Sequence, residues 1–166
     1  MAPLDNRTAI CPGTFDPVTK GHLDVISRAS AMYDTVIVAV VNMPWRKGST
    51  LFSAEERVTF VRNATGEFPN IEVAPFSTLV VEFARERGAM AIVKGLRAIS
   101  DFEYELEMNQ LNRRQAPEIE SVYLMASAKY SFLSSSGVKE LATFGGDIDE
   151  LVPAEVATAL KERLSR

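Results

Sequence analysis

Short apolar runs alternate with longer segments of mixed polarity along nearly the whole chain. The runs are rich in β-branched residues and are four to seven residues long, which is typical of strands buried in a parallel sheet. The segments between them are long enough to hold a helix each, so the alternation indicates βαβ units. We predict five strands, at residues 8–11, 35–41, 71–76, 90–94 and 121–126.

The segments between the runs repeat apolar residues at helical spacing. After the first run, Val25, Ile26 and Ala29 would share one face, which predicts that His22 opens a helix. Elsewhere, capping boxes, a C-terminal glycine, a proline and a serine run mark the helix limits. The second helix is predicted to start at Ser53, with Glu56 completing its capping box, and the third to end before Gly88. A long helix is predicted to start at Ser100, with Glu103, and to reach about residue 115. The last two helices are predicted to start near Ser134 and Pro153.

These elements predict an α/β fold. We expect a single Rossmann-like, doubly wound domain over residues 1–166, with a five-stranded, mainly parallel sheet and a C-terminal helix. In an open parallel sheet, ligands bind beyond the carboxyl ends of the strands, where the loops into the following helices gather. We therefore expect the functional site in the loops that read PGTFDPVTKGH, NMPWRKGSTLF, FSTLV, KGLRAIS and SAKYSFLSSS.

The bulk composition narrows the class of protein. Hydrophobic residues make up 46% and charged residues 24% of the 166 residues, as in globular rather than disordered or fibrous proteins. The net charge of −4 and the pI near 5.1 argue against a nucleic-acid or anionic-membrane partner. No segment has the apolar length of a signal peptide or a membrane span. The single cysteine, Cys11, indicates a reducing compartment, and we expect the cytoplasm.

Two of the loops have features that indicate anion binding. His22, the only histidine, stands at a helix start, where free N–H groups and a partial positive charge attract anions. The alternative is a solvated side chain at the helix start. The serines at 134–136 offer hydroxyl and N–H groups at another helix start, although capping alone would need only one of them. The sequence shows no cysteine and histidine cluster and no paired carboxylates that would mark a dedicated metal site.

Three motifs resemble those of one enzyme family. Residues 13–22, GTFDPVTKGH, are similar to the first signature of the HxGH-type nucleotidyltransferases, with Thr19 in place of its first histidine. With that threonine, the pattern PGTFDPxTxGH resembles the phosphopantetheine adenylyltransferase family. Residues 94–113 and 130–142 are similar to the central and C-terminal signatures of this family. The three motifs occur in the family's order and cover most of the chain.

The resemblance implies a reaction. The adenylyl group of ATP would be transferred to 4′-phosphopantetheine, giving dephospho-coenzyme A and pyrophosphate. Mg²⁺ would arrive with ATP, coenzyme A would be a feedback ligand, and the chain would form a homohexamer. Such a reaction brings two anions together while charge builds up around the α-phosphorus, so positioning and electrostatics matter more than covalent catalysis.

The resemblance also implies roles for individual residues. His22 stabilises the pentacovalent α-phosphate, and the Thr14 hydroxyl orients the acceptor phosphate. Lys94 and Val80 contact the acceptor. The implied ATP site consists of Thr14, Phe15, His22, Gly95, Leu96, Arg97, Glu105, Tyr130, Ser131, Phe132, Leu133, Ser134, Ser135 and Ser136.

The second loop carries a phosphate-binding lysine in the family, and here its counterpart stays open. This loop is about two residues longer than the usual form. Straight register from the strand favours Arg46, whereas placing the insertion earlier in the loop favours Lys47. Two further charged residues are set outside the site. We expect Asp16 to brace its turn, since a carboxylate would repel phosphates, and we expect Lys139 to be solvated.

Two other functions compete with this interpretation. A relative of the same superfamily would act on glycerol phosphate as a cytidylyltransferase, or on nicotinamide mononucleotide as an adenylyltransferase. Thr19 and the later motifs favour the pantetheine enzyme over both. A non-catalytic nucleotide or coenzyme A sensor would keep the phosphate-binding loops without the chemistry, and the presence of Thr14, His22 and Arg97 argues against it.

Overall fold

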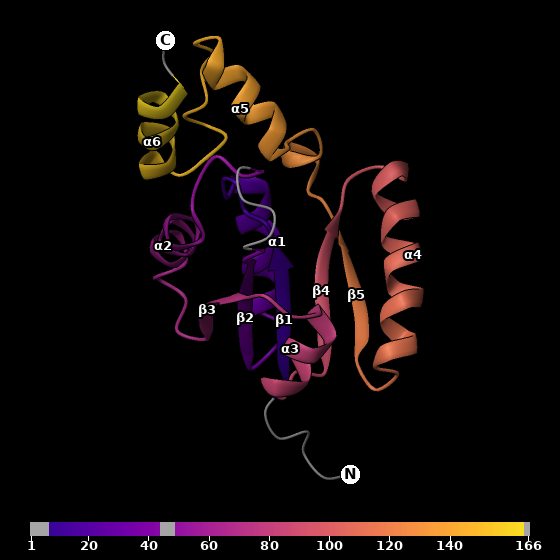
Figure 1. Cartoon of the computed structure of the whole chain (residues 1–166). Coiled ribbons are helices and arrows are strands. Elements are labelled where there is room, and N and C mark those ends of the chain that lie inside the picture. Colours follow the sequence, from indigo (N-terminus) through magenta and orange to yellow (C-terminus); the bar gives the residue numbers. More distant parts are fainter. Residues whose placement is uncertain (1–6, 44–48, 165–166) are drawn as a thin grey trace.

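Five parallel strands form one sheet, in the order β3–β2–β1–β4–β5 (Figure 1). The computed structural model describes residues 7–43 and 49–164. Because β2 and β3 lie on one side of β1, and β4 and β5 on the other, the strand order reverses at β1, as in doubly wound folds. The predicted α/β fold is confirmed. The strands are β1 (Thr8–Gly13), β2 (Thr35–Val41), β3 (Ile71–Phe76), β4 (Ala91–Leu96) and β5 (Glu120–Met125).

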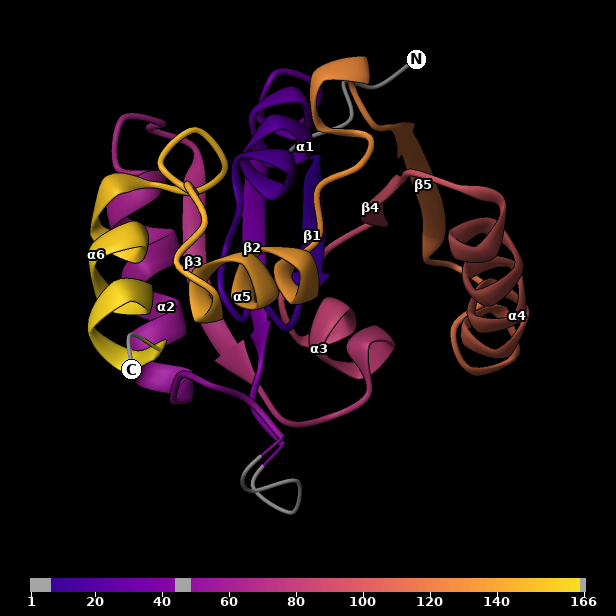
Figure 2. The same ribbon diagram turned by 90° about the horizontal axis from the view of Figure 1, so that it is seen from above.

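Helices cover both faces of this sheet. Figure 2 shows α1 and α3 on opposite sides of β1 and β2. The two buried apolar clusters follow from the alternation of side chains along each strand. In β2, for example, Val36, Val38 and Val40 belong to one cluster, and Ile37 and Ala39 to the other. The helices are α1 (Lys20–Ser30), α2 (Ala54–Ala64), α3 (Val80–Glu86), α4 (Ile99–Gln115), α5 (Ser135–Thr143) and α6 (Ala154–Leu164).

The predicted helix limits hold where the local chemistry is self-contained. Ser53 and Glu56 form the expected capping box, in which the Ser53 hydroxyl accepts from the Glu56 N–H at 3.2 Å and the Glu56 carboxylate accepts from the Ser53 N–H at 2.8 Å. Gly88 has a φ of 64°, the left-handed conformation that glycine adopts readily after a helix. Both limits are therefore confirmed.

The predicted start of the long helix is wrong. The first residue of α4 is Ile99 and its N-cap is Ala98, which makes no side-chain cap hydrogen bond. Instead, the Asp101 carboxylate accepts from the Arg97 N–H at 3.2 Å and pairs with the Arg97 guanidinium at 3.0 Å. Asp101, in the first turn of α4, thus reaches back to the chain before the helix, the role that the predicted box gave to Glu103, and the helix begins at Ile99.

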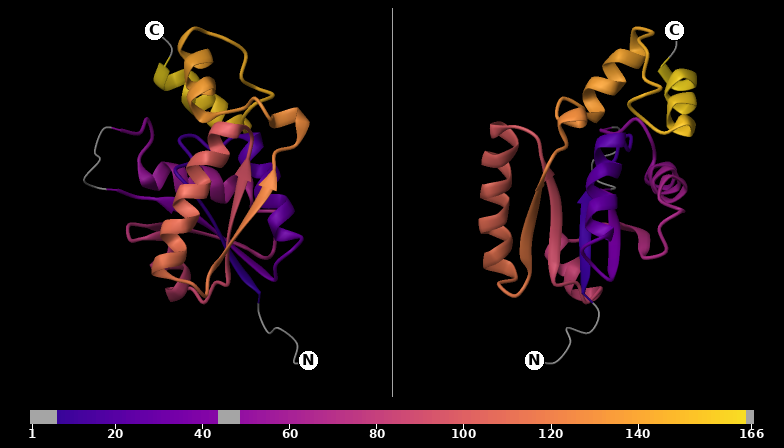
Figure 3. Two further views of the ribbon diagram at one scale, coloured as in Figure 1. Left: turned by 90° about the vertical axis from the view of Figure 1, so that its right-hand side faces the viewer. Right: turned by 180° about the vertical axis from the view of Figure 1, so that it is seen from behind.

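The last two helices lie beyond the carboxyl ends of the strands (Figure 3). Val138 of α5 and Val156 and Leu160 of α6 are fully or almost fully buried in the same cluster as the α1 face of the sheet. The C-terminal segment is therefore part of the core, and this packing fixes the serine run above the sheet edge. In the part of the chain that the structure describes, no helix is long and apolar enough to cross a membrane.

Candidate active site

Two adjoining clefts open at the carboxyl ends of β1 and β4. The first cleft, of about 540 Å³, lies between the start of α1, the end of β4 and the start of α5. The second cleft, of about 710 Å³, lies between the ends of β1 and β2 and the start of α2. Both are lined by Pro12, Gly13, Lys94 and Tyr104, so they share a wall. This is the edge where the strand order reverses and where doubly wound sheets bind ligands.

The loop after β1 is tightly folded between the two clefts. Phe15 has a φ of 51°, a strained conformation for a residue with a side chain, and its ring packs over Gly13. A Cβ at position 13 would come within 2.9 Å of that ring, so only glycine fits there. The His22 ring packs edge-on against the Phe15 ring at a centroid distance of 5.1 Å. The glycine therefore lets the Phe15 ring pack between Gly13 and the imidazole.

The hydrogen bonds of His22 determine which ring nitrogen carries the proton. Thr19 is the N-cap of α1, and its N–H donates to the His22 Nδ1 at 3.0 Å. Because the neutral imidazole accepts at Nδ1, its proton is on Nε2, which becomes a donor. The Thr19 hydroxyl in turn accepts from the His22 N–H at 3.3 Å. The backbone N–H of residue 19 thus sets the tautomer of His22, while the Thr19 side chain caps the helix.

Arg97 and the serine run form the opposite side of the first cleft. The Arg97 Nη1 donates to the Leu133 carbonyl at 2.7 Å, which ties the end of β4 to the loop before α5. Ser134 caps α5 by accepting from the Gly137 N–H at 3.0 Å, and the Ser135 hydroxyl donates to the Pro17 carbonyl at 2.8 Å. Two of the three serines thus have structural partners, and capping occupies one of them.

Lys94 and Glu105 are bonded to each other. The Lys94 Nζ lies 2.9 Å from both carboxylate oxygens of Glu105. The lysine lines both clefts and the glutamate lines the first. The pair stands where the shared wall meets α4, so an anion in either cleft competes with Glu105 for the lysine.

The structure brings most of the predicted site residues to these two clefts. Thr14 and Val80 line the second cleft, and Lys94 lines both. Leu96 is buried, and Ser131 and Phe132 are exposed, and none of these three lines either cleft. Arg46 and Lys47 lie outside the described residues. The predicted residues that line the first cleft are Phe15, His22, Lys94, Gly95, Arg97, Glu105, Tyr130, Leu133, Ser134, Ser135 and Ser136.

Comparison with known proteins places the chain in a family. Residues 10–141 match the cytidylyltransferase-like family. The chain is 48% identical over 159 residues to the phosphopantetheine adenylyltransferase of Clostridium botulinum (strain Hall), with 96% of each chain covered. It is 52% identical over 157 residues to the enzyme of the same name from Alkaliphilus oremlandii, with 95% of this chain and 99% of the relative covered. The chain belongs to the phosphopantetheine adenylyltransferase family.

A solved structure shares the fold of this phosphopantetheine adenylyltransferase family member. A Vibrio parahaemolyticus protein assigned as a nicotinate-nucleotide adenylyltransferase matches with a TM-score of 0.65 at 16% identity, over 93% of this chain and 91% of that chain. At this identity the likeness concerns the fold alone. The resemblance to the phosphopantetheine adenylyltransferase family is confirmed by the sequence relatives.

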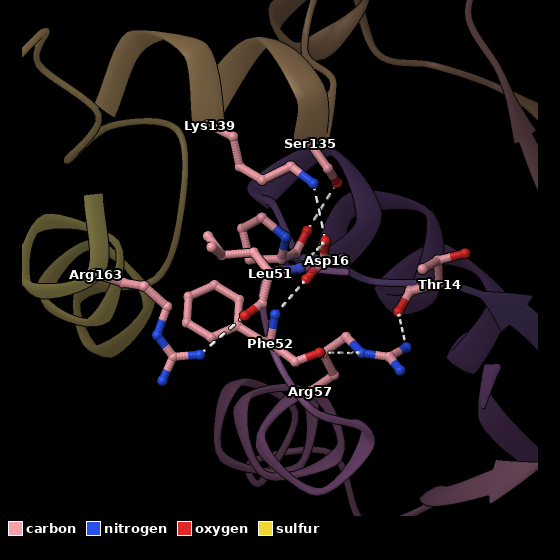
Figure 4. A network of polar contacts seen from close by, with 9 residues as sticks. Thr14, Asp16, Leu51, Phe52, Arg57, Ser135, Lys139 and Arg163 are labelled. Atoms are coloured by element: carbon pink, nitrogen blue, oxygen red, sulfur yellow. Dashed lines mark hydrogen bonds and ion pairs between the residues drawn. The ribbon is translucent and has the colours of Figure 1, made fainter. Parts of the chain in front are cut away.

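Sequence reasoning missed a partly buried ion pair beside the site. The expectation that Lys139 is solvated is wrong. Its Nζ lies 2.8 Å from the Asp16 carboxylate, which is only 5% exposed (Figure 4). The same carboxylate accepts from the N–H groups of Leu51 and Phe52, both at 2.9 Å. Asp16 therefore braces more than its own turn, since it joins the first loop to the start of α2 and to α5.

The environment of His22 changes its acidity. Burial of the imidazole, and secondarily the positive charge of Arg97, lowers the pKa of His22 from 6.5 to about 4. In the unfolded chain the ring takes up a proton below pH 6.5, whereas in the folded chain it does so only near pH 4. The unfolded state then binds more protons between these values, so stability falls as the pH drops from 6.5 to about 4. At pH 7 the ring is neutral and Nε2 is a donor.

We expect His22 to titrate near pH 4. The chain has one histidine, so its imidazole signal in a proton–carbon NMR spectrum needs no assignment by mutation. The variant Arg97→Met should titrate at a higher pH, because a positive charge has been removed. A midpoint near 6.5 in the unaltered chain would contradict the buried, neutral imidazole.

Proposed function

We propose that this chain transfers the adenylyl group of ATP to 4′-phosphopantetheine by direct in-line attack, with the two substrates meeting where the two clefts adjoin. The reaction is supported by relatives named phosphopantetheine adenylyltransferase, to which the chain is 48% and 52% identical over nearly its whole length. The observation that carries the mechanism is the arrangement of the clefts, because His22 lines the first and Thr14 lines the second, on either side of Gly13. ATP would occupy the first cleft and the acceptor the second.

The reaction needs no nucleophile from the protein. An oxygen of the acceptor phosphate forms a bond to the α-phosphorus of ATP, the bond from that phosphorus to the bridging oxygen breaks, and pyrophosphate leaves. The products are dephospho-coenzyme A and pyrophosphate. Charge grows on the oxygens of the α-phosphate, and the Nε2–H of His22 would donate to one of them. Thr14 would hold the acceptor phosphate through its hydroxyl.

The first cleft provides donors for the triphosphate. Arg97 supplies a guanidinium, and the start of α5 supplies N–H groups and the Ser136 hydroxyl. Mg²⁺ would be bound mainly by the phosphates of ATP and by water, as this ion often is. This assignment fits the described residues, which hold no group of three or more histidine, cysteine, aspartate or glutamate side chains that could bind a metal. When bound, the ion would neutralise charge on the departing pyrophosphate.

Pyrophosphate release tests the reaction. The purified chain should release pyrophosphate from Mg·ATP only when 4′-phosphopantetheine is present, and not when CTP replaces ATP. Release with CTP and glycerol phosphate, or with ATP and nicotinamide mononucleotide, would support one of the superfamily relatives instead. ATP or coenzyme A binding by the folded chain without release under any of these conditions would support the sensor.

The proposal extends to assembly and setting. We expect a cytoplasmic homohexamer that coenzyme A inhibits, and a reducing compartment fits the free, buried thiol of Cys11. A partner surface is available on α4, whose side chains Phe102, Leu106 and Leu111 are each about half exposed.

Light scattering on the purified chain measures its assembly directly. A mass near six times the 18.3 kDa of one chain is the expected result, because the exposed apolar side chains of α4 would be covered by neighbouring copies. The variant Leu106→Glu should lower that mass, since it places a charge in the contact. A mass of one chain for the unaltered protein would contradict the hexamer.

A further inference from the structure

Arg57 is buried at the junction of three segments. It belongs to α2, lines the second cleft and is only 3% exposed. Its Nε donates to the Phe52 carbonyl at 3.1 Å, and its Nη1 donates to the Thr14 carbonyl at 2.7 Å (Figure 4). The same Nη1 also donates to the Val41 carbonyl at 2.8 Å. One guanidinium thus holds the loop after β1, the end of β2 and the segment that leads into α2.

Within residues 7–43 and 49–164, no carboxylate forms an ion pair with Arg57. All three of its hydrogen-bond acceptors are neutral carbonyls. Asp16 acts on it electrostatically, but that carboxylate is already bonded to Lys139. The other described cation in the second cleft, Lys94, has Glu105 as its partner. A buried cation without an anionic partner is costly, and an anion bound in the cleft would reduce that cost.

Arg57 also holds the backbone of Thr14, the residue expected to bind the acceptor phosphate. Thr14 is exposed in the second cleft, and its carbonyl is fixed by the guanidinium. The next residue, Phe15, adopts the strained φ of 51°. Such a conformation persists only when its surroundings hold it, and the hydrogen bond from Arg57 to the preceding carbonyl is part of that support. The hydrogen bond from Arg57 to the Thr14 carbonyl therefore limits the direction in which the Thr14 side chain can point.

We propose that Arg57 is a positioning residue for the acceptor half of the site, holding Thr14 in place and attracting the phosphate of the acceptor into the second cleft. The inference rests on the proposed function and adds a residue to it. An arginine suits this place because its planar group donates in fixed directions to several acceptors at once. A lysine would keep the charge but would not reproduce the three bonds.

The test separates the two substrates. We would measure kcat and KM by pyrophosphate release, and the dissociation constants of ATP and of 4′-phosphopantetheine separately by calorimetry, for Arg57→Lys and Arg57→Met. The matched control is Arg62→Met, since Arg62 is on the same helix but exposed, and donates to the Val73 carbonyl at 3.3 Å. Thermal melting of each variant reports its fold.

We expect acceptor binding to weaken and ATP binding to stay. The KM and dissociation constant for 4′-phosphopantetheine should rise about tenfold in Arg57→Lys and about a hundredfold in Arg57→Met, the range of one lost charged hydrogen bond and then of the charge as well. The ATP dissociation constant should change by less than about threefold, as should every constant of Arg62→Met.

Other results would overturn the inference. Equal losses for ATP and acceptor, unchanged acceptor binding, or an Arg57→Lys variant that does not fold would each show a purely structural role. If Arg57→Met alone does not fold, the lysine variant decides. Failure of the proposed function is separate, because it would appear as an unaltered chain that releases no pyrophosphate, while direct acceptor binding still tests Arg57.

Discussion

Replacing His22 by alanine should reduce turnover by about 10²- to 10³-fold, the usual effect of removing one donor to developing negative charge. The Nδ1 accepts from the Thr19 N–H, so Nε2–H is the donor that the variant lacks. Charge on the α-phosphate oxygens is greatest in the transition state, and the binding of ATP and of the acceptor should therefore change by less than about threefold. Pyrophosphate release and calorimetry measure the two effects. Parallel losses in binding and turnover would assign His22 a positioning or folding role instead.

The tautomer of His22 sharpens this test. The amide nitrogen of glutamine reaches about as far as Nε2, whereas that of asparagine stands near Nδ1. We expect His22→Gln to keep about tenfold more turnover than His22→Asn, which corresponds to one hydrogen bond in the transition state. An asparagine variant as active as the glutamine variant would contradict the assignment of the donor.

Replacing Asp16 by alanine should give the largest loss of stability. The change leaves the N–H groups of Leu51 and Phe52 without their acceptor and removes the partner of Lys139. Losing one partner of a buried pair costs about 3 to 5 kcal/mol, and we expect the lower end because the Lys139 side chain is 29% exposed. For a chain of this size that is a fall of about 10 °C in Tm, measurable by calorimetry or circular dichroism.

An exposed ion pair supplies the control for Asp16. Asp149 pairs with Lys161 at 2.7 Å, but the two side chains are 64% and 52% exposed. Water screens such pairs, so Asp149→Ala should cost less than about 1 kcal/mol. Lys139→Met should lie between the two, because Asp16 keeps its two backbone donors. Equal losses for Asp16→Ala and Asp149→Ala would refute the bracing role of Asp16.

The sequence predicted those parts of the fold that depend on neighbouring residues. The β2 and β3 runs match the strands of the structure. The buried β2 leaves an uninterrupted apolar signature, and β3, at the edge of the sheet, remains recognisable although Glu72 interrupts its apolar run. The Ser53 and Glu56 capping box is likewise complete within four residues. The start of α4 was mispredicted because Asp101 pairs with Arg97, a residue before the helix that the Ser100 and Glu103 pattern does not include.

The site was predictable to the extent that motifs mark it. The loops at residues 13–22 and 130–136 were identified from sequence, and they do meet at the first cleft. The supporting contacts were not, because they join residues far apart in the chain. Lys139 and Asp16 are 123 positions apart, and Arg57 and Thr14 are 43 apart. No local pattern distinguishes such side chains from solvated ones.

The anchoring of the second loop bears on how its length can vary. At its beginning, the Asn42 N–H donates to the Phe76 carbonyl at 2.8 Å, and at its end, Leu51 and Phe52 are held by Asp16. With both ends fixed, insertions or deletions between them change mainly the cost of loop closure, which grows slowly with length. We therefore expect this stretch to tolerate engineered changes of a residue or two. Such changes would leave the contact between Thr14 and Arg57 in place.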